Sequence, residues 1–238
     1  MTRLVLFDVD GTLVNTHRAG SRSVREALLH VYGRTGPIDR YDFHGRTDPQ
    51  IVRELMRMAG LADPEIDRGM DRLWDIYLAR LEEELAAGAP PEVLPGVTEL
   101  LDALHRNGDD LVALLTGNIE PGAALKLGAA DLWHRFDFGA YGSDHERRDR
   151  LPAIAVERAR TATGLEFSGR NVVIIGDTPF DVRCGRELGV WAVAVATGKH
   201  SEAELEAAGA NVVLGNLADT GRALEAIAAG SGAVEPGG

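Results

Sequence analysis

The chain has 238 residues, of which 37 are acidic and 25 are basic, so its formal net charge is −12 at pH 7. This excess of negative charge argues against nucleic acid or an anionic membrane as a partner. The hydrophobic content of 45% is typical of a soluble globular protein, and the length suits one large domain or one domain with an insertion.

The sequence also indicates the cellular compartment in which the protein works. No apolar run approaches the roughly 20 residues that a membrane-spanning helix needs. The single cysteine, Cys184, excludes an internal disulfide and fits a reducing environment. The first residues enter a strand pattern without a basic and apolar leader. We therefore expect a cytoplasmic protein, and the sequence leaves a monomer and a homodimer both open.

The first predicted strand ends in two acidic residues. Residues 4–7, LVLF, form a continuous apolar run, which is typical of a strand buried on both faces of a parallel sheet. Asp8 and Asp10 follow it, and Gly11 allows a sharp turn. Because residues i and i+2 of an extended chain point to the same side, the two carboxylates can share a site at the carboxyl end of the strand. An ordinary acidic turn explains this segment alone equally well.

A helical module is predicted between this strand and the rest of the chain. Amphipathic helices are expected over residues 17–32, from Thr47 or Asp48 to about Met58, and from Asp63 to about Ala87. The break AAGAPPE ends the last of them. Residues 15–92 are therefore predicted to be an insertion.

Strands and helices alternate after the insertion. A helix is predicted over residues 95–108, and four further helices separate or follow strands and strand-to-loop segments at 111–118, 136–144, 171–181, 190–198 and 211–214. This alternation predicts an α/β fold with a Rossmann-like parallel sheet, in which residues 1–14 and 93–238 form the core. Residues 231–238 are expected to fray.

Two later strand ends also carry polar groups. Thr116, Gly117 and Asn118 follow the apolar run LVALL, and a hydroxyl with backbone N–H groups at a helix start can hold a phosphate. Asp177 and Asp181 follow the run VVII within the segment GDTPFD. A helix cap and a solvated loop explain either segment taken singly. Three acidic or polar strand ends in this order are hard to explain in that way.

The segments DVDGT, TGN and GDTPFD together resemble the haloacid dehalogenase superfamily, and the resemblance is closest to its phosphoglycolate-phosphatase-like branch. It implies that the insertion is a cap over the active site and that Thr116 holds the transferring phosphoryl group. Gly117 and Asn118 would help to bind the substrate. Mg²⁺, which prefers oxygen ligands, would be held by Asp8, the backbone carbonyl of Asp10 and Asp177, with Asp181 in support.

One position departs from the family pattern, because no lysine stands between the TGN and GDTPFD segments. The stretch there is rich in arginine, and Arg148 is our candidate to replace the lysine, with Arg147 and Arg150 as alternatives. An arginine stays charged and can hold phosphate while neutralising Asp8. A solvated arginine-rich loop remains the other interpretation. Lys126 and Lys199, the two lysines of the chain, are not expected at the family position.

The resemblance implies a Mg²⁺-dependent phosphatase that hydrolyses a small-molecule phosphate monoester. Asp8 would form an aspartyl-phosphate, and Asp10 would serve as general acid and then as general base. Phosphoglycolate is the default substrate, while sugar phosphates, phosphonates and nucleotides stay open. Arg46 could bind a second anionic group or form a salt bridge. The alternatives are a phosphosugar mutase of the same fold and a catalytically weak phospho-binding protein.

Overall fold

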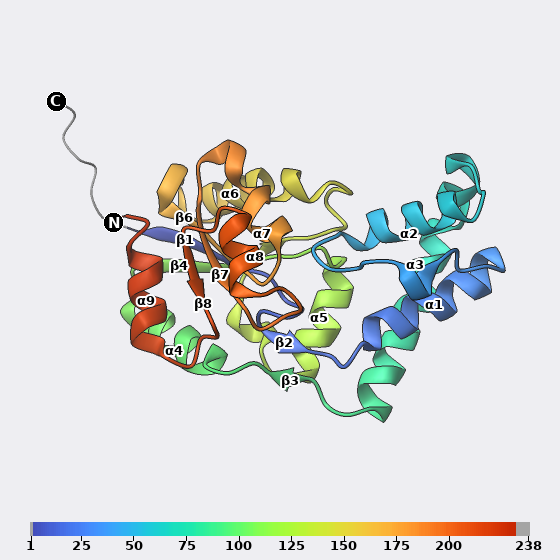
Figure 1. Ribbon diagram of the computed structural model, residues 1–238, viewed down its shortest axis with the longest axis horizontal. Helices are drawn as coiled ribbons and strands as arrows, with labels where there is room; N and C mark the ends of the chain where they lie inside the picture. Colours follow the sequence, from blue (N-terminus) through green and yellow to red (C-terminus); the bar gives the residue numbers. More distant parts are fainter. Residues whose placement is uncertain (1, 232–238) are drawn as a thin grey trace.

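The computed structural model describes residues 2–231, and a parallel sheet lies at its centre (Figure 1). Six strands pair in the order β5-β4-β1-β6-β7-β8, and every pair is parallel. The strands are β1 (Arg3–Phe7), β4 (Asp110–Leu115), β5 (Gly139–Ala140), β6 (Val172–Gly176), β7 (Trp191–Val195) and β8 (Val212–Leu214). This is the predicted α/β architecture.

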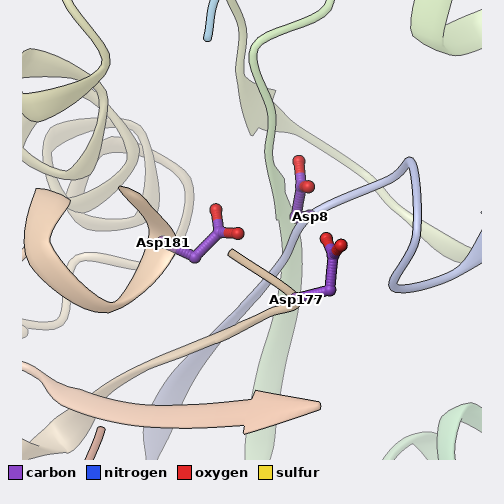
Figure 2. A group of neighbouring side chains, drawn as sticks. All are labelled: Asp8, Asp177 and Asp181. Atoms are coloured by element: carbon purple, nitrogen blue, oxygen red, sulfur yellow. The ribbon is translucent and has the colours of Figure 1, made fainter. Parts of the chain in front are cut away.

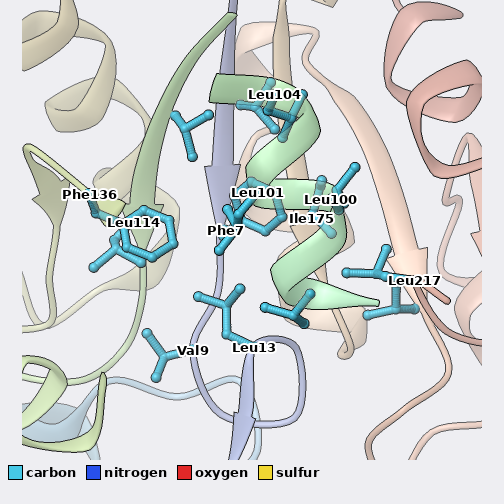
Figure 3. Close-up of a cluster of buried hydrophobic side chains, with 14 of the residues drawn as sticks. Phe7, Val9, Leu13, Leu100, Leu101, Leu104, Leu114, Phe136, Ile175 and Leu217 are labelled. Atoms are coloured by element: carbon cyan, nitrogen blue, oxygen red, sulfur yellow. The ribbon is translucent and has the colours of Figure 1, made fainter. Parts of the chain in front are cut away.

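Strand β1 explains why the sheet is buried on both faces. Its side chains alternate, so that Val5 and Phe7 join one hydrophobic cluster while Leu4 and Leu6 join another on the opposite face. All four are fully buried. Figure 3 shows Phe7 packed beside Leu101 of α4 and near Ile175 of β6. The continuous apolar run of the sequence is therefore the centre of a three-layer structure.

Helices cover the two faces of the sheet. The clusters of buried side chains place α4 (Val97–Asn107), α5 (Glu120–Ala129) and α9 (Thr220–Ala228) on the Phe7 face. The opposite face is covered by α6 (Leu151–Thr163), α7 (Pro179–Cys184) and α8 (Glu202–Ala207). Short 3₁₀ turns lie at η1 (Ile38–Arg40), η2 (Trp133–Arg135), η3 (Arg148–Arg150), η4 (Gly169–Asn171) and η5 (Arg186–Leu188).

Three helices between β1 and β4 form a separate group at one end of the molecule (Figure 1). They are α1 (Ala19–Tyr32), α2 (Asp48–Met58) and α3 (Asp63–Ala87), and they bury a hydrophobic cluster of their own. A two-stranded antiparallel ribbon, β2 (Val14–Asn15) with β3 (Glu92–Val93), joins the two ends of this segment. Ile119 and Leu125, at the start of α5 and within it, pack against the same cluster.

The region after β6 differs from the prediction. We expected a strand and a loop over residues 171–181, but a six-residue helix, α7, begins at Pro179. Thr178 caps it, because the Thr178 hydroxyl accepts a hydrogen bond from the backbone N–H of Asp181. Such a short helix has too few turns to show the 3.6-residue period in the sequence. The expected fraying falls, except for Ser231, outside the described residues.

The topology brings three chain segments to one edge of the sheet. Phe7 of β1 lies opposite Leu114 of β4 and Ile175 of β6. The residues that follow these strands therefore leave the same edge side by side, as ligand-binding loops of open α/β sheets do. Among residues 2–231, no helix is both long enough and apolar enough to cross a bilayer.

Candidate active site

One cavity of about 600 Å³ opens at the carboxyl ends of β1, β4 and β6 and reaches under α1 to α3. All the predicted site residues except Asp181 line it. These are Asp8, Asp10, Arg46, Thr116, Gly117, Asn118, Arg148 and Asp177. Residues from five separate parts of the chain therefore meet at a single space that is large enough for a small molecule.

Three buried carboxylates gather beside this cavity. Figure 2 shows Asp8 from the end of β1, Asp177 from the end of β6 and Asp181 from α7. Each offers an oxygen within 4.8 Å of the others, and all three side chains are buried. Arg148 partly balances their charge: its Nη2 lies 3.0 Å from Asp8 Oδ1 and also donates to Asp181 Oδ1.

Burial is the main cause of the raised pKa values of the carboxyl groups in this cluster. Burial raises the pKa of Asp8 to about 6, and Asp181 and Asp10 add to the rise while Arg148 opposes it. Burial, together with the carboxylates of Asp181 and Asp8, also raises the pKa of Asp177 well above its ordinary value. The pKa of Arg148 is raised by Asp181 and Asp8 despite the opposing effect of its burial. The cluster therefore carries more negative charge than one guanidinium offsets, and a divalent cation with a preference for carboxylate oxygens fits it.

Two glycines, Gly11 and Gly198, lie directly against the carboxylate of Asp177. A Cβ atom on Gly198 would collide with Asp177 Oδ2, and one on Gly11 would lie 2.6 Å from the same oxygen. Thr12 donates from its hydroxyl to Asp177 Oδ1 at 3.4 Å. Two glycines and a hydroxyl therefore hold this carboxylate close to Asp8.

Asp181 already uses both of its oxygens. Oδ1 accepts from Arg148, and Oδ2 accepts from the backbone N–H of Thr178 at 3.0 Å and from the Thr178 hydroxyl at 2.7 Å. Such a carboxylate is suited to orient the arginine. Asp8 and Asp177 are better placed to hold a metal, with the backbone carbonyl of Asp10 as the expected third ligand.

The arginine-rich stretch separates into one buried and two exposed residues. Arg148 is 6% exposed, whereas Arg147 and Arg150 are exposed, and Arg147 pairs with its neighbour Asp149. Arg148 is thus the one of the three candidates that contacts Asp8.

Asp10 has a different environment from Asp8. Its Oδ2 accepts from Lys126 Nζ at 2.6 Å and from Asn118 Nδ2 at 2.8 Å. Burial would raise the pKa of Asp10, but the ammonium of Lys126 and the hydrogen bonds from Lys126 and Asn118 lower it below the ordinary value. The two aspartates of the first loop therefore have opposite pKa shifts, because Asp10 is hydrogen-bonded to an ammonium group while Asp8 is buried among other carboxylates.

The segment after β4 links the sheet to the insertion. Asn118 donates to the buried Thr116 hydroxyl at 2.8 Å as well as to Asp10. The Gly117 carbonyl accepts from the backbone N–H of Asp48 at 2.7 Å. A Cβ on Gly117 would strike the carbonyl of Arg46. The chain at residues 46–48 therefore passes directly over Gly117, which only a glycine permits.

Arg46 already has partners in this structure. Its Nη1 lies 3.1 Å from both carboxylate oxygens of Glu54, and its guanidinium lies over the rings of Tyr41 and Phe180 at 5.4 and 5.6 Å. Of the two roles expected for Arg46, the salt bridge is therefore the one formed in this structure. Any anion that Arg46 binds has to share it with Glu54.

Two side chains of the cavity did not emerge from the sequence. Lys126 is buried, contacts Asp10 and belongs to an otherwise apolar segment of α5, where a single lysine was the available signal. Asp48 lines the cavity, accepts from the backbone N–H of Ile119 at 2.9 Å, and burial raises its pKa to about 6. The sequence pattern places Asp48 only at the start of a helix.

The fold and this arrangement of strand ends define a parallel α/β core with a helical insertion. Residues 5–186 match the model of the haloacid dehalogenase-like hydrolase family. Because this match spans most of the chain, the protein belongs to that family of enzymes.

Two relatives and one solved structure are similar to this chain over most of its length. "Probable phosphatase IndB" of Dickeya dadantii is 28% identical over 231 residues, which are 95% of each chain. "Phosphoglycolate phosphatase 1" of Pseudomonas aeruginosa is 28% identical over 223 residues, 92% of this chain and 78% of that protein. The crystal structure of a hydrolase from Pseudomonas syringae matches with a TM-score of 0.69 and 22% identity, and covers 94% of this chain and 98% of its own. That last likeness concerns the fold.

Proposed function

We propose that this protein is a Mg²⁺-dependent phosphatase that hydrolyses a small-molecule phosphate monoester through an aspartyl-phosphate on Asp8. The observation that carries the proposal is the division between the two aspartates of the first loop. Asp8 lies with Asp177 and Arg148, whereas Asp10 lies with Lys126 and Asn118, and both line one cavity. The phosphatase names of the two relatives support it.

The first step would transfer the phosphoryl group to Asp8. A carboxylate oxygen of Asp8 bonds to phosphorus while the bond from phosphorus to the ester oxygen breaks. Asp10, which has to be protonated when the ester binds, gives this proton to the departing oxygen. Arg148, Thr116 and the backbone N–H groups after β4 would hold the charged phosphoryl oxygens, since Thr116 and Arg148 both line the cavity.

The second step would release phosphate. Asp10, now a carboxylate, takes a proton from a water molecule that attacks phosphorus, and the bond between phosphorus and Asp8 breaks. Asp181 has no direct part in either step, because it orients Arg148 through its Oδ1. When bound by Asp8, Asp177 and the Asp10 carbonyl, Mg²⁺ supplies positive charge that offsets the negative charge of the phosphoryl group.

The insertion would act as the cap of the site. We propose residues 15–92 as the cap and residues 1–14 and 93–238 as the core, on the separate hydrophobic clusters of the two parts. The cap supplies Arg46, Asp48 and aromatic side chains to the cavity. Phosphoglycolate is the default substrate, on the resemblance and on the second relative. The buried free thiol of Cys184 fits work in the cytoplasm.

The mutase and phospho-binding alternatives make different demands. A mutase would need a sugar bisphosphate to prime Asp8, whereas a phospho-binding protein would need no rapid turnover. A second carboxyl group, that of Asp10, in the same cavity as Asp8 favours turnover over binding alone.

The test is phosphate release from a panel of phosphate esters, phosphoglycolate included, with and without Mg²⁺. Native protein should turn over at least one ester only with Mg²⁺, and Asp8→Asn should abolish this turnover, because the amide is a poor nucleophile. Arg46→Gln is a useful companion, since it changes the cap and leaves Asp8 intact. Its KM should rise most for esters that carry a second anionic group.

The same panel distinguishes the alternatives. Phosphate release that depends on an added sugar bisphosphate would favour the mutase. A folded protein that is phosphorylated by acetyl phosphate but releases phosphate from no ester would favour phospho-binding.

A further inference from the structure

We propose that Lys126 is a positioning residue for Asp10, and that it holds one oxygen of this carboxylate so that the other is presented for proton transfer. The inference deepens the proposed phosphatase reaction and rests on it. It concerns a lysine outside the three segments that led to the site.

The contacts form a closed triangle of three side chains. Lys126 Nζ donates to Asp10 Oδ2 at 2.6 Å and to Asn118 Oδ1 at 2.6 Å. Asn118 Nδ2 donates to the same Asp10 Oδ2 at 2.8 Å. Each member is therefore oriented by the other two, and Asn118 cannot turn its amide over without losing both contacts.

The surroundings hold the lysine in place. Lys126 is 5% exposed, on a helix that packs against the insertion through Leu125. On the insertion side lie Gly20 of α1 and Tyr77 of α3, and a Cβ on Gly20 would approach Lys126 Nζ to 3.3 Å. A lysine is ordinarily a mobile surface residue. Here its amine is fixed between the core and the cap, at one wall of the cavity.

The two donors occupy the same oxygen of Asp10. Oδ2 receives both Lys126 and Asn118, whereas the contact of Oδ1 is the Thr16 hydroxyl at a long 3.5 Å. Oδ1 is therefore the oxygen that can carry the proton to the substrate. When the ester bond breaks, the proton on Oδ1 passes to the departing oxygen, and the carboxylate left behind is held by the Lys126 ammonium.

The chain thus gives each of its two first-loop acids a separate cation. Arg148 contacts Asp8, and Lys126 contacts Asp10. The other lysine, Lys199, lines the same cavity but pairs with Asp42 of the insertion at 2.8 Å. It therefore serves as a control of matched chemistry.

The test compares esters with good and poor leaving groups in Lys126→Met. A nitrophenolate departs without a proton, whereas an alkoxide needs one, so only the alkyl ester depends on a well-placed acid. The quantity to compare is kcat/KM, because it includes steps only up to release of the alcohol and leaves out the later hydrolysis of the aspartyl-phosphate. The substrates are the best alkyl phosphate of the panel and 2,4-dinitrophenyl phosphate.

We expect Lys126→Met to lower kcat/KM for the alkyl phosphate by about 10²-fold, the lower end of what a general acid contributes. The value for dinitrophenyl phosphate should change little. Lys126→Gln keeps a polar group and should give an intermediate loss, and it replaces Lys126→Met if that variant does not fold. Lys199→Met should change kcat/KM for both esters by the same factor.

A double variant asks whether Lys126 acts through Asp10. Asp10→Asn combined with Lys126→Met should be no slower on the alkyl ester than Asp10→Asn alone, because the acid is already lost. Circular dichroism and thermal unfolding would check that each variant is folded.

Other outcomes overturn the inference in distinguishable ways. Equal losses on both esters, or multiplicative losses in the double variant, would mean that Lys126 is structural or binds substrate, while the phosphatase reaction stands. If the native protein turns over neither ester in a manner that depends on Asp8, the proposed function fails and the role of Lys126 falls with it.

Discussion

Arg148 is the side chain that compensates the negative charge of the buried acidic cluster in the folded protein. It is buried, and a single nitrogen, Nη2, contacts both Asp8 and Asp181. Its Nε is buried without a hydrogen-bond partner among the described residues. A buried charge without its counter-charge is far more costly than the pair. The arginine therefore affects stability as well as any chemistry at Asp8.

Replacing Arg148 should destabilise the protein most when Mg²⁺ is absent. Arg148→Met leaves three buried carboxylates without a cation and should lower the free energy of unfolding by about 3–5 kcal/mol. Arg148→Lys should lose less, because one ammonium can take the place of Nη2 and removes the unpaired Nε. Urea unfolding with and without MgCl₂ measures both.

The neighbouring arginine supplies the control for this measurement. Arg147→Met removes an exposed side chain that pairs with Asp149, and it should change the free energy of unfolding by no more than about 0.5 kcal/mol. A comparable loss in Arg147→Met and Arg148→Met would contradict the assignment of Arg148 as the buried counter-charge.

At the scale of elements, the site depends on close approaches between loops. The loop after β7 passes so near Asp177 that Gly198 has no room for a side chain. The loop after β4 meets the insertion in the same way at Gly117. Glycine is required at these two points by contact, and neither shows the positive φ that makes glycine necessary at Gly11.

Gly198→Ala should weaken Mg²⁺ binding while leaving the core folded. The added methyl group has to displace the Asp177 carboxylate, and misplacing a ligand group typically costs about 10–100-fold in metal affinity. Mg²⁺ titration followed by thermal shift measures the affinity.

Gly128→Ala is the matched control, because a Cβ at Gly128 in α5 meets nothing within 4 Å. It should keep Mg²⁺ affinity and gain about 0.5–1 kcal/mol of stability from the better helix former. An unchanged affinity in Gly198→Ala would show that Asp177 does not hold the metal.

At the scale of the whole molecule, metal, protons and folding are linked. Burial raises the pKa of Asp8 from its usual 3.8 to about 6, so the folded metal-free protein binds more protons than the unfolded chain between these values. Its free energy of unfolding should therefore fall as the pH rises through this window.

Mg²⁺ should reverse this trend. A cation binds the ionised carboxylates, so the increase in Tm on adding Mg²⁺ should be larger at about pH 7.5 than at about pH 5. Thermal unfolding at the two pH values measures it, with Asp8→Asn as the control in which the difference should shrink. An increase of the same size at both values would mean that the metal does not bind the Asp8 cluster.

The sequence alone was sufficient for the order of the sheet strands along the chain and for which strand ends carry acidic or polar residues. The apolar run of residues 4–7 identifies a doubly buried strand, and spacing by two puts Asp8 and Asp10 at its end. Parallel strands that each end in polar residues have to bring these residues to one edge. Local pattern was enough there because strand and helix periods are written in consecutive residues.

Only the tertiary structure decided which charges pair. Three arginines lie within four residues at 147–150, and the fold buries Arg148 against Asp8 while it exposes the other two. Lys126 meets Asp10 across 116 residues of sequence. Such pairs depend on how helices pack on the sheet, which brings together side chains that no local pattern relates. The sequence thus determined the family, the fold and which strand ends carry acidic residues. The packing of helices on the sheet determined which cationic side chains pair with those acids.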